Sequence, residues 1–146
     1  MKGYANPEDW SGTDRVFEPE LAAFNPNHVF YEGGREIRWQ KVSTEPDSHV
    51  DLLPGEWQVG YAYALMSSPV EQEAVFFIGS DDTAKLWLNG KLVYSNYRPR
   101  GSVRGEDRAR VVVKAGMNTL LLKVAQGGGD WGFHFEVGAG QPVTFQ

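Results

Sequence analysis

From residue 57 to residue 137 the chain alternates apolar and polar side chains in short runs, a pattern typical of half-buried β-strands. One run places Ala84, Leu86 and Leu88 on one face and Lys85 and Trp87 on the other. Glycine, asparagine or aspartate separates the runs, and no stretch of useful length has helical periodicity. The pattern predicts an all-β fold, an antiparallel β-sandwich.

The alternation also assigns the side chains that should fill the core. The inward positions of the later strands are Leu86, Leu88, Val111, Leu120, Leu122, Val124, Phe133 and Phe135. A slip of one residue would turn every inward side chain of a strand to the outside, so this set is a specific prediction. On the preceding strand Gly60, Ala62 and Ala64 form a face of small residues, which predicts a closely packed neighbouring layer.

Two short turns divide residues 74–94 into three predicted strands of one meander. Asn89-Gly90 is a strong hairpin signal, because a type I′ turn needs positive φ at both central residues. The other turn, 79–82, places two adjacent carboxylates at a strand end.

Alternate connections of a meander lie at the same end of the sheet, so the longer loops should meet at one end of the sandwich. These loops are 79–83, 95–107 and 126–131. The minimal turns at 89–90 and 115–116 should lie at the other end. Function tends to concentrate on long loops held by a rigid scaffold.

Residues 1–28 have little periodicity and many Pro, Asn, Asp and Glu residues, which predicts irregular chain that wraps the surface. Residues 36–42 alternate and predict a strand. At 146 residues the chain is expected to form one domain, 1–146, that buries a core without disulfides or a structural metal.

Composition restricts the partners. The net charge of −5 argues against a nucleic-acid phosphate surface. The absence of cysteine excludes disulfides, thiolate zinc sites and a cysteine nucleophile. No apolar run is long enough for a membrane span, and the N-terminus leads into no signal-peptide core. We expect a module of a larger bacterial protein that works outside the cell or in the periplasm, rather than an intracellular protein.

Loop 95–107 carries the first candidates for ligand binding. It is the longest connection in the regular half of the chain. Tyr97 offers an aromatic face on which a sugar ring can stack. Arg98, Arg100 and Arg104 offer guanidinium groups that suit carboxylates and sulfates, as in a uronic-acid polysaccharide.

Asp130 and Trp131, within the glycine-rich segment 127–132, are the second pair of ligand-binding candidates. Trp131 is expected to act in one of two ways. It is either a stacking platform for a sugar or a plug that closes the end of the core.

No catalytic constellation is recognisable, so an enzyme is not expected. His28, His49 and His134 are dispersed along the chain, and no Gly-x-Ser-x-Gly elbow is present. Asp81 and Asp82 are adjacent and should point to opposite sides, which makes them a poor acid–base pair for glycoside hydrolysis.

Two segments carry a family resemblance: GSDDTAKLWLNGKLVYSN and VVVKAGMNTLLLKVAQGGGDWGFHFEV. They resemble the galactose-binding-domain-like modules attached to bacterial polysaccharide-degrading enzymes, including the sugar-binding domain of glycoside hydrolase family 2. The Ser-Asp-Asp…Asn-Gly-Lys-Leu-Val part is also similar to the anthrax protective-antigen-type accessory domain. The resemblance covers residues 57–137 and implies a jelly-roll sandwich that binds carbohydrate.

In the protective-antigen-type domains, paired aspartates bind calcium and, through it, sugar hydroxyls. The resemblance therefore implies a calcium site at Asp81 and Asp82. Calcium takes six to eight oxygens, to which Asn96, Asp107 and Asp130 could contribute. In the alternative, both aspartates cap a turn by accepting backbone N–H bonds.

We therefore expect a non-catalytic carbohydrate-binding module with no required cofactor. It would hold a linked catalytic domain near a polysaccharide or oligosaccharide. The alternative is a structural spacer of a multidomain glycan-active enzyme with no ligand of its own. Besides the loop end, a sheet face is an alternative binding surface, with the side chains Lys85, Trp87, Lys123, His134 and Glu136.

Overall fold

The computed structural model describes residues 1–43 and 48–146, and within them nearly all regular structure is β. Two short 3-10 helices, η1 (Ser11–Thr13) and η2 (Glu18–Glu20), follow the first strand. The strands are β1 (Lys2–Ala5), β2 (Val29–Glu32), β3 (Arg35–Arg38), β4 (His49–Asp51), β5 (Gln58–Ser68), β6 (Gln72–Asp81), β7 (Thr83–Leu88), β8 (Lys91–Asn96), β9 (Asp107–Val113), β10 (Gly116–Ala125), β11 (Gly132–Ala139) and β12 (Thr144–Phe145).

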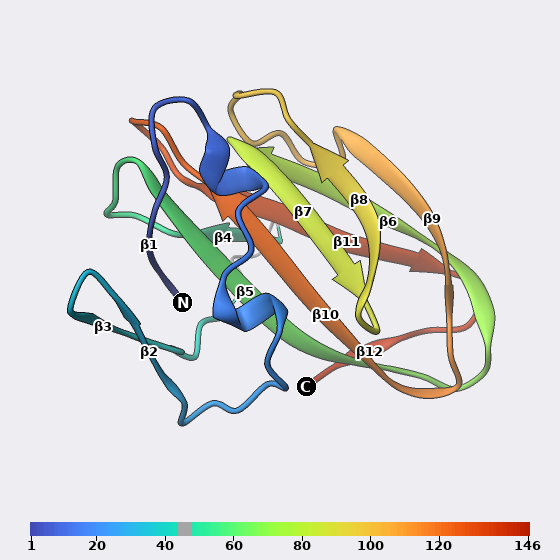
Figure 1. The fold of residues 1–146 in the computed structure, drawn as a ribbon. Helices are drawn as coiled ribbons and strands as arrows, with labels where there is room; N and C mark the ends of the chain where they lie inside the picture. Colours follow the sequence, from blue (N-terminus) through green and yellow to red (C-terminus); the bar gives the residue numbers. More distant parts are fainter. Residues whose placement is uncertain (44–47) are drawn as a thin grey trace.

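Two antiparallel sheets pack face to face (Figure 1). The first sheet has the order β1-β5-β10-β7-β8, with β12 added to β5. The second sheet has the order β4-β11-β6-β9, and β2 pairs with β3 in a separate hairpin. The predicted all-β, antiparallel sandwich is confirmed. Neither helix in the described part of the chain has the length and apolar character of a membrane-spanning segment.

The core between the sheets contains all eight predicted side chains. Phe135 is partly buried, and the other seven are buried. Ala62 and Ala64 of β5 also pack against this core, so the small-residue face of that strand does meet a neighbouring layer. The alternation along the strands therefore predicted the register correctly.

The predicted meander is wrong at its first turn. β6 belongs to the second sheet and β7 to the first, and Asp82 alone connects them through a cis Asp81–Asp82 peptide. Residues 79–81 thus continue β6 instead of forming a turn. The second turn is confirmed, since Asn89 and Gly90 have φ of 51° and 81° and join the paired strands β7 and β8.

The longer loops nevertheless meet at one end, as predicted. The last register pairs of the strands next to these loops lie at the same end of the sandwich, so the loops leave the two sheets there. These pairs are Gly132–Asp81, Ala125–Thr83 and Asn96–Ala84. We call this end, with residues 82, 97–106 and 126–131, the loop end. The opposite end, with residues 89–90 and 114–115, is the hairpin end.

The N-terminal segment wraps the outer face of the first sheet, as expected, and Figure 1 shows it in blue in front of β5 and β10. It is more regular than expected, because β1 pairs with β5. Beneath it lies a second core of Tyr4, Phe17, Phe30, Ile37, Val59, Tyr61 and Ala125. Of the predicted strand 36–42, only residues up to Arg38 belong to β3.

Candidate functional site

The long loop of residues 97–106 folds back over the outer face of the second sheet. Ser102 Oγ lies 2.7 Å from His134 Nδ1 on β11. Arg104 donates from Nε and Nη2 to the carboxylate of Glu136 on the same strand. These contacts hold the loop on β11, and a ligand carboxylate at Arg104 would have to displace Glu136.

Gly79 of β6 lets the backbone of this loop come close. A Cβ at Gly79 would lie 2.0 Å from the carbonyl oxygen of Val103, a distance at which the loop would have to move. The requirement is for space, because only hydrogen fits between the two backbones. The length of the loop is thus explained by its return over the sheet.

Arg100 stabilises the loop end through contacts with other side chains of the protein. Its Nη2 donates to Asp107 Oδ2 at 2.6 Å and to Tyr94 Oη at 3.2 Å. Its Nε lies 3.5 Å from Glu106 Oε2, and its side chain is 12% exposed. The hydrogen bond from Arg100 is the main reason that the pKa of Asp107 is below its usual value. Asp107 and Arg100 are therefore partners of each other, and a ligand carboxylate at Arg100 would have to displace Asp107.

Tyr97 and Arg98 of the predicted loop site are exposed, as is Arg104. Tyr97 is 56% exposed, donates its hydroxyl to Asp14 Oδ1 at 2.9 Å, and has Lys85 Nζ 5.6 Å from its ring centroid. The buried Asn96 bonds both the N–H and the carbonyl of Arg98, each at 3.0 Å. The loop start is thus fixed, with both side chains at the surface.

Asp81, the first residue of the predicted carboxylate pair, lines a small cavity at the loop end. Asp81 is 8% exposed, whereas Asp130 is exposed. Burial, followed by the charges of Asp82 and Asp130, raises the pKa of Asp81 to about 7. Asp82 Oδ2 accepts the backbone N–H of Gly127 at 3.0 Å. The cavity has a volume of about 250 Å³ and is lined by Asp81 and Asp130 together with His49, Asp51 and Ser102.

These carboxylates supply only part of a calcium site. The described residues contain no group of three or more His, Cys, Asp or Glu side chains that could hold a metal ion. One oxygen of Asp82 accepts the backbone N–H of Gly127, so this contact joins the crossing between the sheets to segment 126–131 and does not cap a local turn. The further candidates are also engaged, since Asp107 binds Arg100 and Asn96 Oδ1 accepts from Arg98. Calcium would need backbone or ligand oxygens to complete its six to eight contacts.

Trp131 is a plug, and the platform alternative is wrong for it. The side chain is 1% exposed and belongs to the core between the sheets. A Cβ on Gly55 would lie 2.6 Å from its ring, and one on Gly60 would lie 3.0 Å away. Lys2 Nζ lies 5.6 Å from the ring centroid. A sugar therefore has no access to its face.

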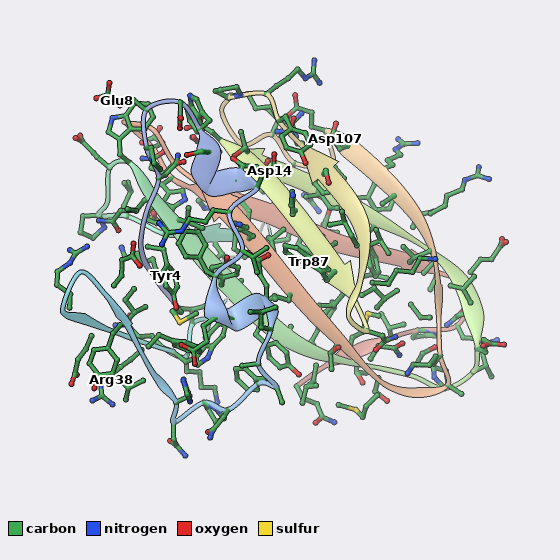
Figure 2. The ribbon with its side chains drawn as sticks, in the orientation of Figure 1. Tyr4, Glu8, Asp14, Arg38, Trp87 and Asp107 are labelled. Atoms are coloured by element: carbon green, nitrogen blue, oxygen red, sulfur yellow. The ribbon has the colours of Figure 1, made fainter. Side chains whose placement is uncertain are left out.

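The predicted alternative sheet face is two separate surfaces. Lys85, Trp87 and Lys123 lie on strands of the first sheet, whereas His134 and Glu136 lie on β11 of the second. Lys123 is 1% exposed, because the N-terminal segment covers it. Trp87 remains half-buried, and Figure 2 shows it on β7 on the face that carries the N-terminal segment.

A groove of about 450 Å³ opens beside Trp87, between the N-terminal segment and the outer face of the first sheet. We call it the aromatic groove, after its lining side chains Phe24, Phe30, Trp39, Tyr63 and Trp87. Phe24 stacks on Tyr63 with ring centroids 3.7 Å apart and an interplanar angle of 6°. Trp39 meets Phe24 edge-on at 5.1 Å. Four of the five rings are partly exposed, and Phe24 packs against both Tyr63 and Trp39.

Sequence reasoning missed this groove. Phe24 lies in a weakly periodic segment. Trp39 and Tyr63 lie in alternating segments, whose pattern predicts strands but does not show which other side chains they meet. The groove joins four parts of the chain that are distant in sequence, so local spacing carries no signal of it. The high aromatic content of 13% was a sign in the sequence that some aromatic side chains could lie at the surface.

The structure also brings together two histidines that appear dispersed in the sequence. His49 and His134 are register partners on β4 and β11, with ring centroids 4.7 Å apart. The third, His28, bonds Glu18 on another face of the fold. The contact of His134 with Ser102 attaches the long loop to β11.

The predicted site residues therefore lie at one end but have different roles. Arg100 and Arg104 hold the loop, Trp131 fills the core, and Tyr97 and Arg98 are exposed. No protein-family model, no curated protein and no solved structure matches the chain.

Proposed function

We propose that this domain is a non-catalytic carbohydrate-binding module that binds a polysaccharide or oligosaccharide in the aromatic groove. The observation that carries the proposal is the set of partly exposed rings around one cavity of about 450 Å³. Pyranose rings present C–H groups that pack on aromatic faces. Rings that already pack on one another, as Phe24 does on Tyr63, can hold sugar units with little further loss of conformational entropy in the protein.

The groove supports sugar binding better than the loop end does. Two of the three loop arginines are bonded to carboxylates of the protein, and Trp131 is buried. Tyr97 remains exposed, but Lys85 lies over its ring. A single ring offers less stacking area than a groove lined by several.

The proposed role is to keep a linked catalytic domain near its substrate, in a larger bacterial protein outside the cytoplasm. Weak binding suffices for that role, because linkage raises the effective concentration of the second domain at the polymer. The resemblance of residues 57–137 to accessory modules supports this assignment.

Affinity electrophoresis in gels that contain neutral plant or algal polysaccharides tests the proposal. The wild type should be retarded by at least one polymer. Trp87→Ala should bind roughly fivefold or more weakly, equivalent to about 1 kcal/mol of lost stacking. Trp87→Phe, which keeps an aromatic face, should retain most of the affinity. Circular dichroism of each variant checks that it is folded.

Tyr97→Ala is the matched control, because Tyr97 is an exposed aromatic residue outside the groove. Its retardation should equal that of the wild type. Loss of binding in Tyr97→Ala but not in Trp87→Ala would assign the site to the loop end. If no polymer retards the wild type, the spacer alternative replaces the proposal.

Calcium at Asp81 and Asp82 is a separate hypothesis, and the groove does not depend on it. A bound ion stabilises the folded state by mass action. Melting at pH 8 with millimolar calcium, and again with a chelator, tests it directly. A higher melting temperature with calcium, absent in Asp81→Asn, supports the ion site. Equal melting temperatures leave Asp82 with its structural contact to the Gly127 N–H alone.

A further inference from the structure

The hairpin end, which carries the short turns at 89–90 and 114–115, has a groove of about 980 Å³. In Figure 1 the β7–β8 hairpin and β9 diverge toward this end, and β6 and β11 pass behind them. Residues of all these strands line the groove. The position is unexpected, because loop length alone favours the opposite end.

Three exposed basic side chains line this groove: Lys91, Arg110 and Lys114. None of them forms an ion pair with a carboxylate of the described residues. Glu73 is the acidic member of the described lining. The groove thus gathers unpaired positive charge on a chain whose net charge is −5, whereas Arg100 and Arg104 at the loop end are paired.

The backbone that carries two of these cations is fixed by a buried asparagine. Asn118 is fully buried, accepts from the N–H of Lys114 and donates to its carbonyl, both at 2.9 Å. Asn89, two residues before Lys91, donates to Asn118 Oδ1 at 2.9 Å and accepts from the Thr119 N–H. One network therefore holds both turns in place, which fixes the backbone from which Lys91 and Lys114 extend.

We propose that this groove, the basic groove, binds the carboxylates of an acidic polysaccharide such as a polyuronate. The inference rests on the proposed function only in taking the ligand to be a glycan. Beside its cations the groove is lined by Val75, Leu88, Val93, Val111 and Val112. A uronic acid matches this combination, since it presents C–H faces together with a carboxylate.

A nucleic acid suits the groove less well. Its described lining includes no aromatic side chain on which a base could stack.

Polygalacturonate and its fully methyl-esterified form are the probes, because they share one backbone and differ in carboxylate charge. Affinity electrophoresis and calorimetry at low salt should show binding of the acidic polymer and little binding of the ester. Each of Lys91→Gln, Arg110→Gln and Lys114→Gln should weaken binding roughly fivefold. The triple variant should abolish it, and added salt should weaken binding of the wild type.

A second triple variant, Arg35→Gln with Lys41→Gln and Arg108→Gln, removes three exposed cations outside both grooves. It lowers the net charge by the same amount and should bind as the wild type does. Equal losses in the two triple variants, or equal binding of acid and ester, would overturn the proposal. Binding of a DNA oligonucleotide that depends on the same three residues would overturn the glycan assignment.

Trp87→Ala separates this proposal from the aromatic groove. It should weaken binding of neutral polymer and leave binding of polygalacturonate unchanged. If the protein binds neutral polysaccharide through Trp87 but does not bind polygalacturonate, only the proposal for the basic groove is refuted. If the protein binds polygalacturonate but no neutral polysaccharide, only the proposal for the aromatic groove is refuted.

Discussion

Lys123 Nζ lies 2.8 Å from Glu20 Oε1, and this ion pair ties the N-terminal segment to the first sheet. The two side chains are 1% and 9% exposed. Lys123 also donates to the Arg15 carbonyl, and Tyr61 donates its hydroxyl to Glu20. Burial nevertheless lowers the pKa of Lys123 below its usual value. The buried charge of Lys123 is therefore tolerated because the carboxylate of Glu20 balances it.

Glu20→Gln should lower the free energy of unfolding by about 3–5 kcal/mol, because it leaves the buried ammonium of Lys123 without its counter-charge. Denaturant unfolding measures the change. Glu20→Gln with Lys123→Met should recover much of the loss, since no unpaired buried charge remains.

Glu36→Gln is the control for this prediction. Glu36 pairs with Arg38 at 2.9 Å, but both side chains are more than half exposed, and Figure 2 shows Arg38 at the rim of the molecule. The expected loss is about 0.5 kcal/mol or less. Similar losses in Glu20→Gln and Glu36→Gln would contradict the role given to the buried pair.

Asp81 should make the fold less stable as pH rises. Its pKa is about 7 in the folded state, against 3.8 for an ordinary aspartate. The folded protein therefore holds a proton that the unfolded chain releases, and its stability falls between about pH 4 and pH 7. Asp81→Asn removes this dependence, and at pH 8 it should be more stable than the wild type by on the order of 1–2 kcal/mol.

Melting temperatures of both proteins from pH 4 to pH 8 check this prediction. Asp130→Asn should shift the profile in the same direction by a smaller amount, because Asp130 contributes to the raised pKa of Asp81. Parallel profiles of wild type and Asp81→Asn would show that the carboxyl is not perturbed.

Gly79→Ala should loosen the long loop. The new methyl group would lie 2.0 Å from the Val103 carbonyl oxygen, so the loop must leave the sheet. We expect a loss of about 1–3 kcal/mol and faster proteolysis within residues 97–106. Gly128→Ala is the control, because a Cβ there meets no atom within 4 Å. Equal behaviour of the two variants would remove the packing explanation.

The sequence predicted the features that depend on a period of two. Leu122 and Phe133 face the core because their strands alternate, and the positive φ of Asn89 and Gly90 follows from the residues that a type I′ turn needs. It could not show that β6 and β7 belong to different sheets. An acidic turn between paired strands and a crossing between sheets have the same local pattern of residues.

The candidate sites were harder to predict, because they depend on contacts between distant segments. In the sequence Arg100 and Arg104 look available to a ligand, but in the fold each binds a carboxylate of the protein. The partner of Arg104, Glu136, lies 32 residues away along the chain, so the pairing has no local signal. Tyr63 becomes part of a groove only when Phe24 stacks on it. Residue types predicted the chemistry of these side chains, but folding decided which of them remain accessible.

Trp131 should affect stability and leave sugar binding intact. It is 1% exposed, so Trp131→Ala removes a large core side chain and should cost about 3–5 kcal/mol. Trp131→Phe should cost less, because it fills part of the space and the indole N–H has no hydrogen-bond partner in the described structure. Denaturant unfolding measures both losses, and affinity electrophoresis on a neutral polysaccharide measures binding. Trp131→Phe should bind as the wild type does, whereas a platform would lose affinity in proportion to the missing ring area. If Trp131→Phe is fully folded but binds more weakly than the wild type, Trp131 is a stacking platform after all. If Trp131→Ala has the same free energy of unfolding as the wild type, Trp131 does not fill the core as a plug.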